Sequence, residues 1–443
     1  MPPRFGTDGI RGVANLDLTP EVVLALGRAA ARVLRAGRFV VGRDPRASGP
    51  MLQAALSAGL ASEGASVLDL GVVPTPAVAY ASASRGVPGA VVSASHNPFS
   101  DNGVKLFGAG GHKLDDEAEA AIEAELAILA GTIAPVAPGP PVGDIGVDDA
   151  VVAGYVAHLA SSLDGGRLDG LRVVLDCANG AASSMGPGVF TGLGAVVEVI
   201  ADRPDGRNIN LDCGSTHPGA LADAVMSFRA DVGLAFDGDA DRVLAVDATG
   251  ALVDGDQLLA LLALDRRGRG SLADDTVVVT VMANLGFRRS MASAGITVHE
   301  TPVGDRYVLG ALRAGGWSLG GEQSGHLIFP DLATTGDGIL TGLQVLDVVA
   351  RSGRSLADLA GRAMTRLPQV LRNVTVIGGA GGAAEAIGAD VAAARSELGD
   401  GGRVLVRPSG TEPLVRVMVE AETVEQAGAV AGRLVAALER QGA

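Results

Sequence analysis

The sequence has 443 residues, more than one hydrophobic core normally organises, so three or four domains are expected. Hydrophobic residues make up 47% of the chain and charged residues 19%, a balance typical of a globular protein and not of a disordered one. The net charge of −15 argues against nucleic-acid binding, which needs a basic surface to neutralise phosphates.

Neither a membrane segment nor a cysteine-based site is predicted. No apolar run approaches the ~20 residues needed to span a bilayer, and the residues after Met1 lack the apolar core of a signal peptide. Cys177 and Cys213 fit no metal or redox spacing, which favours a reducing compartment. We therefore expect a cytoplasmic protein without nucleic-acid or membrane partners. A small anionic substrate remains open if arginines are concentrated locally.

Three successive stretches alternate short β-branched strands with helical segments rich in Ala and Leu. This alternation predicts βαβ units with mostly parallel sheets. The predicted strands are 39–43, 66–70 and 89–93 in the first stretch, with a helix at about 50–63; 171–176, 195–200 and 232–236 in the second; and 276–282, 296–300 and 317–319 in the third.

A fourth stretch predicts a smaller α+β unit, with strands at 373–377, 403–406 and 415–419 and a helix from about 423 to 441. The Pro/Gly-rich segment 131–146 is interpreted as a linker or long loop, and another boundary is placed near Leu252. The predicted fold class is therefore α/β. Three similar α/β domains with mixed, mostly parallel sheets cover 1–150, 151–252 and 253–368, and an α+β domain covers 369–443.

In each of these three stretches, a polar motif follows the last predicted strand that leads to it. Ser95, Asp237 and Glu322 stand at these three strand ends. In open α/β sheets, ligands bind outside the carboxyl ends of the strands. We therefore expect the three ends to form one shared site.

The motif Asp237-Gly-Asp-Ala-Asp-Arg242 places three carboxylates at alternate positions. Two such charges 4 Å apart repel by about 4 kcal/mol at an effective dielectric near 20. A divalent cation removes this repulsion, and oxygen ligands favour Mg²⁺ or Ca²⁺ over zinc. An EF-hand is excluded, because Arg242 and Ala248 stand where its loop needs Gly and Glu. A solvated acidic turn is the alternative to a metal site.

The motif Ser93-Ala-Ser-His-Asn-Pro98 ends a strand and turns at Asn-Pro. Ser95 beside His96 suggests a nucleophile with a proton-handling neighbour, and Lys105 follows closely enough to fold back onto it. The same residues also suit an ordinary turn. Together with a three-Asp metal site, however, a serine nucleophile indicates phosphoryl transfer, in which positioning and charge neutralisation do most of the catalysis.

Two further motifs suggest substrate contacts. Arg407-Pro-Ser-Gly-Thr-Glu-Pro413 combines a guanidinium, hydroxyls and backbone N–H donors, as a phosphate clamp requires, although turns also use these residues. In Gly321-Glu-Gln-Ser-Gly-His326, Glu322, Ser324 and His326 alternate and could point together at sugar hydroxyls or an amino group. A loop with a satisfied histidine is the alternative.

The segment Phe5-Gly-Thr-Asp-Gly-Ile-Arg-Gly12 is predicted to be a loop that presents Arg11. No strand precedes it and its spacing is not that of a Rossmann fingerprint, while the absence of a Walker A motif argues against a P-loop kinase. Arg46, in Gly42-Arg-Asp-Pro-Arg46, and Arg306, in Gly304-Asp-Arg306, could approach an anion or form surface ion pairs.

Taken in order across nearly the whole chain, five of these motifs resemble the α-D-phosphohexomutase superfamily. They are the segments that begin at Gly6, Ser93, Asp237, Gly321 and Arg407. The resemblance implies four domains around a central cleft and a homodimer. Gln323 and Val303-Gly-Asp-Arg-Tyr-Val308 resemble the branch that acts on hexosamine phosphates, whereas the phosphomannomutase/phosphoglucomutase branch usually carries a charged residue in place of Gln323.

The resemblance also assigns roles. Ser95 is expected to carry the phosphoryl group, with Mg²⁺ held by the phosphoserine and Asp237, Asp239 and Asp241. Arg11, His96 and Lys105 are expected beside the transferring group, with Arg242 and Arg306 in support. Glu322 and Ser324 are expected on the sugar, and the non-reacting phosphate is expected on Arg407, Ser409, Gly410 and Thr411.

The activity implied is the interconversion of glucosamine 6-phosphate and glucosamine 1-phosphate through a 1,6-bisphosphate, in the route to UDP-N-acetylglucosamine. A hexose or hexosamine 1,6-bisphosphate is the expected primer. Three alternatives stay open: a phosphomannomutase or phosphoglucomutase of the same fold, a metal-dependent phosphatase that uses the same serine and aspartates, and a non-catalytic phosphosugar sensor. A sensor is expected to have lost nucleophile or metal ligands, and this sequence keeps them.

Overall fold

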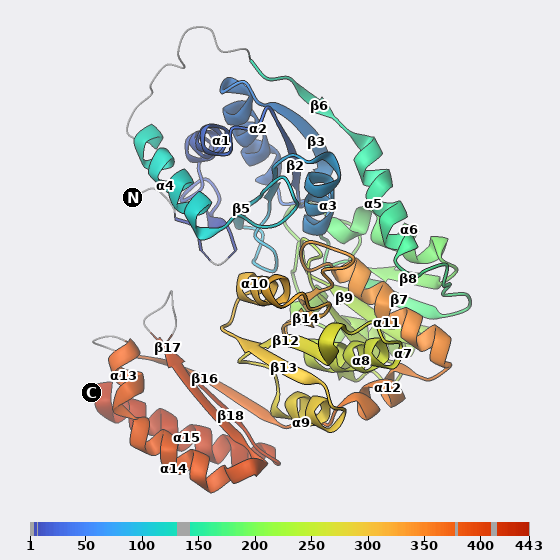
Figure 1. Ribbon diagram of the computed structural model, residues 1–443, viewed down its shortest axis with the longest axis vertical. Coiled ribbons are helices and arrows are strands. Elements are labelled where there is room, and N and C mark those ends of the chain that lie inside the picture. The colour runs from blue at the N-terminus through green and yellow to red at the C-terminus, as the bar shows by residue number, and fades with distance from the viewer. Residues whose placement is uncertain (1–3, 7, 131–141, 377–379, 409–413, 443) are drawn as a thin grey trace. The chain divides into compact units, whose positions relative to one another are not determined.

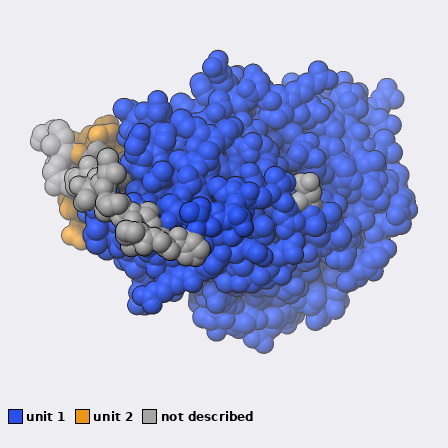
Figure 2. Space-filling model, turned by 90° about the horizontal axis from the view of Figure 1, so that it is seen from above, with its two compact units in different colours: residues 1–282, 296–362 blue, residues 283–295, 363–443 orange. Residues whose placement is uncertain are grey.

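The computed structural model describes residues 4–6, 8–130, 142–376, 380–408 and 414–442. The chain forms two compact units (Figure 2). The first unit contains Met1–Met282 and Ile296–Arg362, and the second contains Ala283–Gly295 and Ala363–Ala443. Three sheets belong to the first unit, and we call the parts built on them lobes I, II and III in chain order (Figure 1).

Lobe I carries a six-stranded sheet in the order β1-β5-β4-β2-β3-β6. Parallel pairs join β4, β2, β3 and β6, and antiparallel pairs join β1 to β5 and β5 to β4. Its elements are β1 (Ile10–Val13), α1 (Pro20–Leu34), β2 (Arg38–Arg43), α2 (Gly49–Ser62), β3 (Ser66–Val72), α3 (Thr75–Arg85), β4 (Gly89–Val92), β5 (Asp101–Phe107), α4 (Asp116–Ala130) and β6 (Ile145–Val147).

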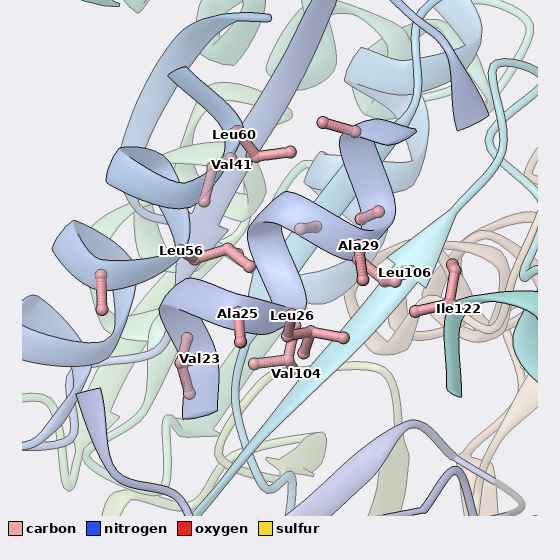
Figure 3. Packing of buried hydrophobic residues seen from close by; sticks show 14 of the residues in the cluster. Val23, Ala25, Leu26, Ala29, Val41, Leu56, Leu60, Val104, Leu106 and Ile122 are labelled. Atoms are coloured by element: carbon pink, nitrogen blue, oxygen red, sulfur yellow. The ribbon is translucent and has the colours of Figure 1, made fainter. Parts of the chain in front are cut away.

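The core of lobe I lies where α1 packs on α2, α4 and the sheet. Leu26 of α1 meets Val104 of β5, and Leu56 of α2 packs into the same cluster (Figure 3). The two helices cross closely, because a Cβ atom on Gly27 would lie 2.3 Å from the carbonyl oxygen of Leu56. A larger residue at Gly27 would therefore force α1 and α2 apart and leave β4, which leads to Ser95, less firmly supported.

Lobe II carries a five-stranded sheet in the order β11-β10-β9-β7-β8, in which β8, β7 and β9 are parallel and β10 and β11 are antiparallel to their neighbours. All residues of β9 and β10 are buried, as expected for central strands covered on both faces. Its elements are α5 (Asp149–Ser161), β7 (Arg172–Asp176), α6 (Gly186–Gly192), β8 (Val196–Ile200), α7 (Gly219–Phe228), β9 (Val232–Phe236), β10 (Val243–Asp247) and β11 (Leu252–Val253).

Lobe III carries a four-stranded sheet in the order β13-β12-β14-β15, with β15 antiparallel to β14. Its elements are α8 (Gly255–Gly268), β12 (Thr276–Thr280), β13 (Thr297–Thr301), α10 (Asp305–Gly315), β14 (Gly320–Gly321), β15 (Leu327–Ile328), α11 (Gly338–Ser352) and α12 (Leu356–Ala363). Helix α9 (Leu285–Ser293) lies between β12 and β13 in sequence but belongs to the second unit.

The second unit carries an antiparallel sheet in the order β16-β18-β17, covered by helices on a separate hydrophobic core. Its other elements are β16 (Gln369–Thr375), α13 (Ala380–Ala386), α14 (Gly388–Leu398), β17 (Arg403–Pro408), β18 (Leu414–Glu420) and α15 (Val424–Gly442). Among the described residues of both units, no helix has the length and apolar character needed to cross a membrane.

The predicted fold class is confirmed, since three α/β lobes precede a smaller α+β part. Two local predictions were wrong. Residues 145–147, placed partly in a linker, form β6, because the exposed edge of β3 offers hydrogen-bonding groups to any extended segment beside it. Residues 317–319 precede β14 instead of forming a strand. Leu252, near which a domain boundary was predicted, begins β11, the last strand of lobe II in chain order.

Candidate active site

Ser95 lies just beyond the carboxyl end of β4 and is completely buried. Its φ of 51° is in the left-handed region, which a residue with a side chain adopts at a cost. The Ser95 hydroxyl donates a hydrogen bond to Oδ2 of Asp237, at 2.6 Å. Asp237 directly follows β9 of lobe II. The predicted nucleophile and the predicted acidic cluster, which come from different lobes, are therefore in direct contact.

The acidic cluster fits a bound cation. Asp237, Asp239 and Asp241 are all buried, and one carboxylate oxygen from each lies within 4.8 Å of the others. In the part of the chain that the structure describes, Oδ1 of Asp239 and Oδ1 of Asp241 have no hydrogen-bond partner. Burial, reinforced by the charges of Asp241 and Asp239, raises the pKa of Asp237 well above its usual value. Buried carboxylate oxygens that make no hydrogen bond suit a divalent cation with oxygen ligands.

Lys105 lies on β5 with its ammonium group against this cluster. Nζ lies 2.9 Å from Oδ2 of Asp239, 3.1 Å from Oδ2 of Asp241 and 3.0 Å from Oδ2 of Asp8. Burial opposes the charge on Lys105, but these three carboxylates raise its pKa well above the ordinary value. The side chain is therefore a fixed buried cation in contact with two of the metal-ligand candidates, Asp239 and Asp241.

Asp8 connects several of the cations around the site. Besides Lys105, its carboxylate pairs with Arg11 and with Lys113, and Lys113 pairs in turn with Asp305 of lobe III. Burial opposes the charge, yet the neighbouring cations hold the pKa of Asp8 well below its usual range. Asp8, Lys113 and Asp305 were not predicted as site residues from the sequence, although Lys113 and Lys105 are the two lysines of the chain.

Arg11 was predicted on a loop but lies in β1, where it pairs in register with Gly103 of β5. The strand forms because the edge of β5 is available to it. Nη1 of Arg11 lies 3.5 Å from the carbonyl oxygen of Ala94, the residue before Ser95. The structure thus brings Arg11 to the nucleophile loop. It does so from a strand, whereas a loop was predicted.

His96 and Arg242 also lie at the site. Nδ1 of His96 lies 3.2 Å from the Ser95 hydroxyl oxygen. Burial, with a contribution from the charges of Arg242 and Arg11, lowers the pKa of His96 to about 4, so the ring is neutral at pH 7. Arg242 lies 3.7 Å from Asp241 through its Nε atom. Burial opposes the charge of Arg242, while carboxylates led by Asp241 raise its pKa.

Lobe III contributes the loop after β14. Oε1 of Glu322 accepts a hydrogen bond from the backbone N–H of Gly304 at 3.2 Å, and the buried hydroxyl of Ser324 has no partner among the described residues. The third residue of this predicted set, His326, lies between two carboxylates. His326 is buried, with one ring nitrogen 3.7 Å from Asp241 and the other 3.7 Å from Asp305. Burial disfavours its charge, but these carboxylates raise its pKa.

Two other arginines are not placed as an anion-binding role requires. Arg306 pairs with Asp116 at 2.6 Å and Glu119 at 2.7 Å on α4, and therefore joins lobe III to lobe I at the surface. Arg46 is completely buried and donates to backbone carbonyl groups and to Asp44. Both guanidinium groups already have these partners, so neither is available to bind a free anion.

In the second unit, Arg407 lies on β17 directly opposite Arg416 on β18. Burial and the charge of Arg416 lower the pKa of Arg407. Two arginines side by side on neighbouring strands repel, and an anion between them would relieve the repulsion. Arg416 was missed by the sequence analysis because its register opposite Arg407 depends on strand pairing. Ser409, Gly410 and Thr411, the other predicted phosphate-binding residues, lie outside the described residues.

Comparison with family models covers nearly the whole chain. The four domains described as "Phosphoglucomutase/phosphomannomutase" match in chain order: alpha/beta/alpha domain I at residues 2–129, domain II at 153–250, domain III at 254–367 and the C-terminal domain at 371–437. Domain I contains the motifs that begin at Gly6 and Ser93, and each of the other three matched segments contains one of the motifs that begin at Asp237, Gly321 and Arg407.

Similar proteins carry related names. A phosphoglucosamine mutase of Rhodococcus jostii is 55% identical, over 97% of this chain and 98% of its own. One from Acidothermus cellulolyticus is 57% identical, over 98% and 95%. Among solved structures, a phosphoglucomutase/phosphomannomutase family protein of Burkholderia thailandensis has a TM-score of 0.81 at 26% identity, covering 99% of this chain and 98% of its own. An Aspergillus fumigatus N-acetylphosphoglucosamine mutase has a TM-score of 0.71 at 20% identity, covering 99% and 96%, and shares the fold.

Proposed function

The chain belongs to the phosphoglucomutase/phosphomannomutase family, in the branch of the phosphoglucosamine mutases, and from this premise we propose that it interconverts glucosamine 6-phosphate and glucosamine 1-phosphate through phosphorylated Ser95. The observation that carries the proposal is the 2.6 Å contact between the Ser95 hydroxyl and Asp237 of the buried acidic cluster. It supports a nucleophile and a cation site that act together on one phosphoryl group.

In the forward reaction, phosphoserine 95 donates its phosphoryl group to the O1 hydroxyl of glucosamine 6-phosphate, giving glucosamine 1,6-bisphosphate and free Ser95. The bisphosphate turns over, and Ser95 attacks the phosphorus atom of the 6-phosphate. Glucosamine 1-phosphate leaves and Ser95 is again phosphorylated. Atoms balance, since one P–O bond forms and one breaks in each half, and the attacking hydroxyl loses the proton that the leaving oxygen gains.

The surrounding residues have separate roles in the proposal. Lys105 and Arg11 hold positive charge where the transferred group develops negative charge, which is supported by their contacts with Asp8 and, for Lys105, with Asp239. His96 is proposed to accept and return the serine proton, which is supported by the 3.2 Å distance between its Nδ1 and the hydroxyl oxygen. Glu322 and Ser324 bind the sugar, and the hydroxyl of Ser324 has no competing partner among the described residues.

We propose Mg²⁺ as the cation, held by Asp237, Asp239, Asp241 and the phosphorylated Ser95. Its chemistry would be charge neutralisation on the phosphoryl oxygens.

The non-reacting phosphate is proposed to bind Arg407, with Ser409, Gly410 and Thr411. An anion at this position is supported by the two like charges of Arg407 and Arg416, which lie opposite each other on neighbouring strands. A 1,6-bisphosphate primes the enzyme, and a homodimer is the proposed assembly.

The substrate assignment is supported by Gln323. Its side-chain amide donates towards Oδ2 of Asp254 at 3.5 Å, and Asp254 caps the N-terminus of α8. An acidic residue in place of Gln323 would face this carboxylate and be repelled. The loop is therefore adapted to a neutral amide at the position where the phosphomannomutase/phosphoglucomutase branch usually carries a charge.

The test is a substrate panel with glucose 1,6-bisphosphate as primer. Glucosamine, glucose and mannose 6-phosphates are compared for the rate at which the 1-phosphate forms and for release of inorganic phosphate. The proposal predicts the highest kcat/KM for glucosamine 6-phosphate, with no stoichiometric phosphate release. Preference for glucose or mannose phosphates would instead establish the alternative branch, and phosphate release matching substrate loss would establish a phosphatase.

A further inference from the structure

Side chains from two lobes hold the carbonyl group of Ser95. Nη2 of Arg46, in lobe I, donates to the Ser95 carbonyl oxygen at 2.9 Å, and Nδ2 of Asn210, in lobe II, donates to the same oxygen at 2.9 Å. Gly238 of the acidic loop packs closely against the Ser95 carbonyl group and the Asn210 amide. A Cβ atom at Gly238 would lie 2.6 Å from the Ser95 oxygen and 2.8 Å from Nδ2 of Asn210. The nucleophile's backbone is thus enclosed from both sides.

Within lobe I, Arg46 belongs to a buried network that fixes the Ser95 peptide group. Nε of Arg46 donates to Asp44 at 2.8 Å, and the Ser93 hydroxyl donates to the same carboxylate oxygen at 2.7 Å. The Ser93 oxygen in turn accepts the backbone N–H of Ser95 at 2.9 Å. The guanidinium also donates to the carbonyl oxygens of Asn97 at 2.8 Å and Asp101 at 3.0 Å. Both the N–H and the C=O of Ser95 are therefore fixed through one network.

Asn210 reaches the same loop from lobe II. Its φ of 58° is left-handed, a conformation that asparagine tolerates better than most residues, and its backbone N–H donates to Ala178 at 2.9 Å. Besides the Ser95 carbonyl, its amide donates to the carbonyl oxygen of Asn97 at 3.1 Å. Asn210 therefore ties the nucleophile loop of lobe I to the lobe that carries the acidic cluster.

We propose that Arg46 and Asn210 are positioning residues. They hold Ser95 in its left-handed conformation and keep its hydroxyl oxygen aligned with Asp237 during phosphoryl transfer. The inference rests on the proposed function. Ser95 must change between a hydroxyl and a phosphoserine while its backbone keeps an unfavourable conformation, which persists where the surroundings over-determine it. A small displacement of the reacting oxygen is costly, because phosphoryl transfer depends on alignment of the attacking and leaving oxygens.

The experiment uses Asn210→Gly, which removes the amide and keeps the left-handed backbone accessible, and Asn210→Asp, which keeps the size and replaces the donor with an oxygen. The matched control is Asn208→Ala, two residues earlier. The Asn208 side chain donates to Arg203 at 2.9 Å and accepts from the N–H of Asp205 at 3.0 Å, within its own loop. An Arg46→Lys variant tests the partner from lobe I.

The readouts are kcat and KM with glucosamine 6-phosphate, and the rate at which glucose 1,6-bisphosphate phosphorylates Ser95, followed by intact mass. Both Asn210 variants are expected to lower kcat and the phosphorylation rate between about ten-fold and about a hundred-fold, with KM changed by less than about three-fold. Arg46→Lys is expected to lower the same two quantities. Asn208→Ala is expected to leave all of them at wild-type values.

The outcomes separate this inference from the proposed function. If the wild-type enzyme takes up no phosphoryl group on Ser95, the proposed function fails. If the wild-type enzyme is phosphorylated and folded Asn210 and Arg46 variants react at its rate, the positioning role is overturned. The role is equally overturned if Asn208→Ala slows the reaction as much as Asn210→Gly does, because the effect would then come from the loop and not from the amide.

Discussion

The hydroxyl of Ser95 donates a 2.6 Å hydrogen bond to Asp237, a residue 142 positions away in another lobe. This contact joins the ends of two strands, β4 and β9, from separate sheets. The geometry of the site consequently depends on how lobes I and II are held together, and substitutions at their contacts should lower the catalytic rate, although less than loss of the reacting serine does.

Replacement of Asp239 by Asn should weaken binding of the divalent cation. Oδ1 of Asp239 is a buried oxygen without a partner among the described residues, and the amide would put either a neutral oxygen or an N–H group in its place. We expect the dissociation constant for Mg²⁺ to rise at least about ten-fold, which corresponds to about 1.4 kcal/mol, and kcat to fall about a hundred-fold. Calorimetric titration with Mg²⁺ measures the first and the mutase assay the second.

The control for this prediction is Asp212→Asn, at an exposed aspartate of lobe II whose φ of 53° asparagine tolerates. It removes the same formal charge from the same lobe and should leave Mg²⁺ affinity unchanged. Equal affinity loss in both variants would mean that long-range charge, and not ligation by Asp239, determines metal binding.

Replacement of Lys113 by Met should destabilise the protein by about 3 kcal/mol, because it leaves the carboxylates of Asp8 and Asp305 without their shared cation. The Lys113 side chain is only 11% exposed, so water cannot replace it. Arg362→Ala breaks an ion pair with Asp358 in which the two side chains are 65% and 38% exposed, so water solvates both charges and the free energy of unfolding should change far less.

Urea unfolding followed by the fluorescence of Trp317, the one tryptophan of the chain and a residue of lobe III, measures both changes. Similar costs for Lys113→Met and Arg362→Ala would show that the buried ion pairs of Lys113 contribute no more to stability than the exposed pair of Arg362 and Asp358.

Asp337 should make stability depend on pH. It caps the N-terminus of α11, accepts a hydrogen bond from the hydroxyl of Tyr155 at 2.8 Å, and burial raises its pKa to about 6. The unfolded chain binds this proton with a pKa near 3.9. The folded state therefore binds the proton more tightly, and its contribution to stability is lost as pH rises from about 4 to about 6, by at most roughly 3 kcal/mol.

Asp337→Asn keeps a good capping side chain and removes the titration. Between pH 4 and pH 7, the stability of the wild type relative to this variant should fall as pH rises. Urea unfolding of both proteins across this range measures the difference, and a difference that stays constant, or grows with pH, would contradict the assigned pKa.

Much of the fold followed from local patterns. The strands that lead to Ser95 and Asp237 are buried, apolar and β-branched, so their positions were predicted within a few residues. β6 and β14 were missed or displaced, since the first is three exposed residues and the second is two glycines, neither of which carries a strand pattern. Such segments become strands because a neighbouring edge accepts their hydrogen bonds.

Site residues could be predicted where the groups that act together are close in sequence, as in the acidic loop. They were not predicted where function depends on packing between lobes. Arg46 has the sequence appearance of an anion ligand but is buried and donates to backbone carbonyl groups, and the contacts of His326 with Asp241 and Asp305 do not follow from its motif. Asn210 stands in a polar loop with no distinguishing pattern, and Asp8 stands in a motif from which only Arg11 was predicted as a site residue. The partners of both residues are defined only by how distant segments meet.

The central claim is that Ser95 carries the phosphoryl group. The measurement compares three proteins: the wild type, Ser95→Ala and the control Ser100→Ala. Ser100 is an exposed serine of the same loop. Each protein is incubated with glucose 1,6-bisphosphate and Mg²⁺, and its intact mass is measured by mass spectrometry. The account predicts that the wild type and Ser100→Ala each gain one phosphoryl group and are active, while Ser95→Ala gains none and is inactive. A Ser95→Ala protein that keeps full mutase activity would contradict it.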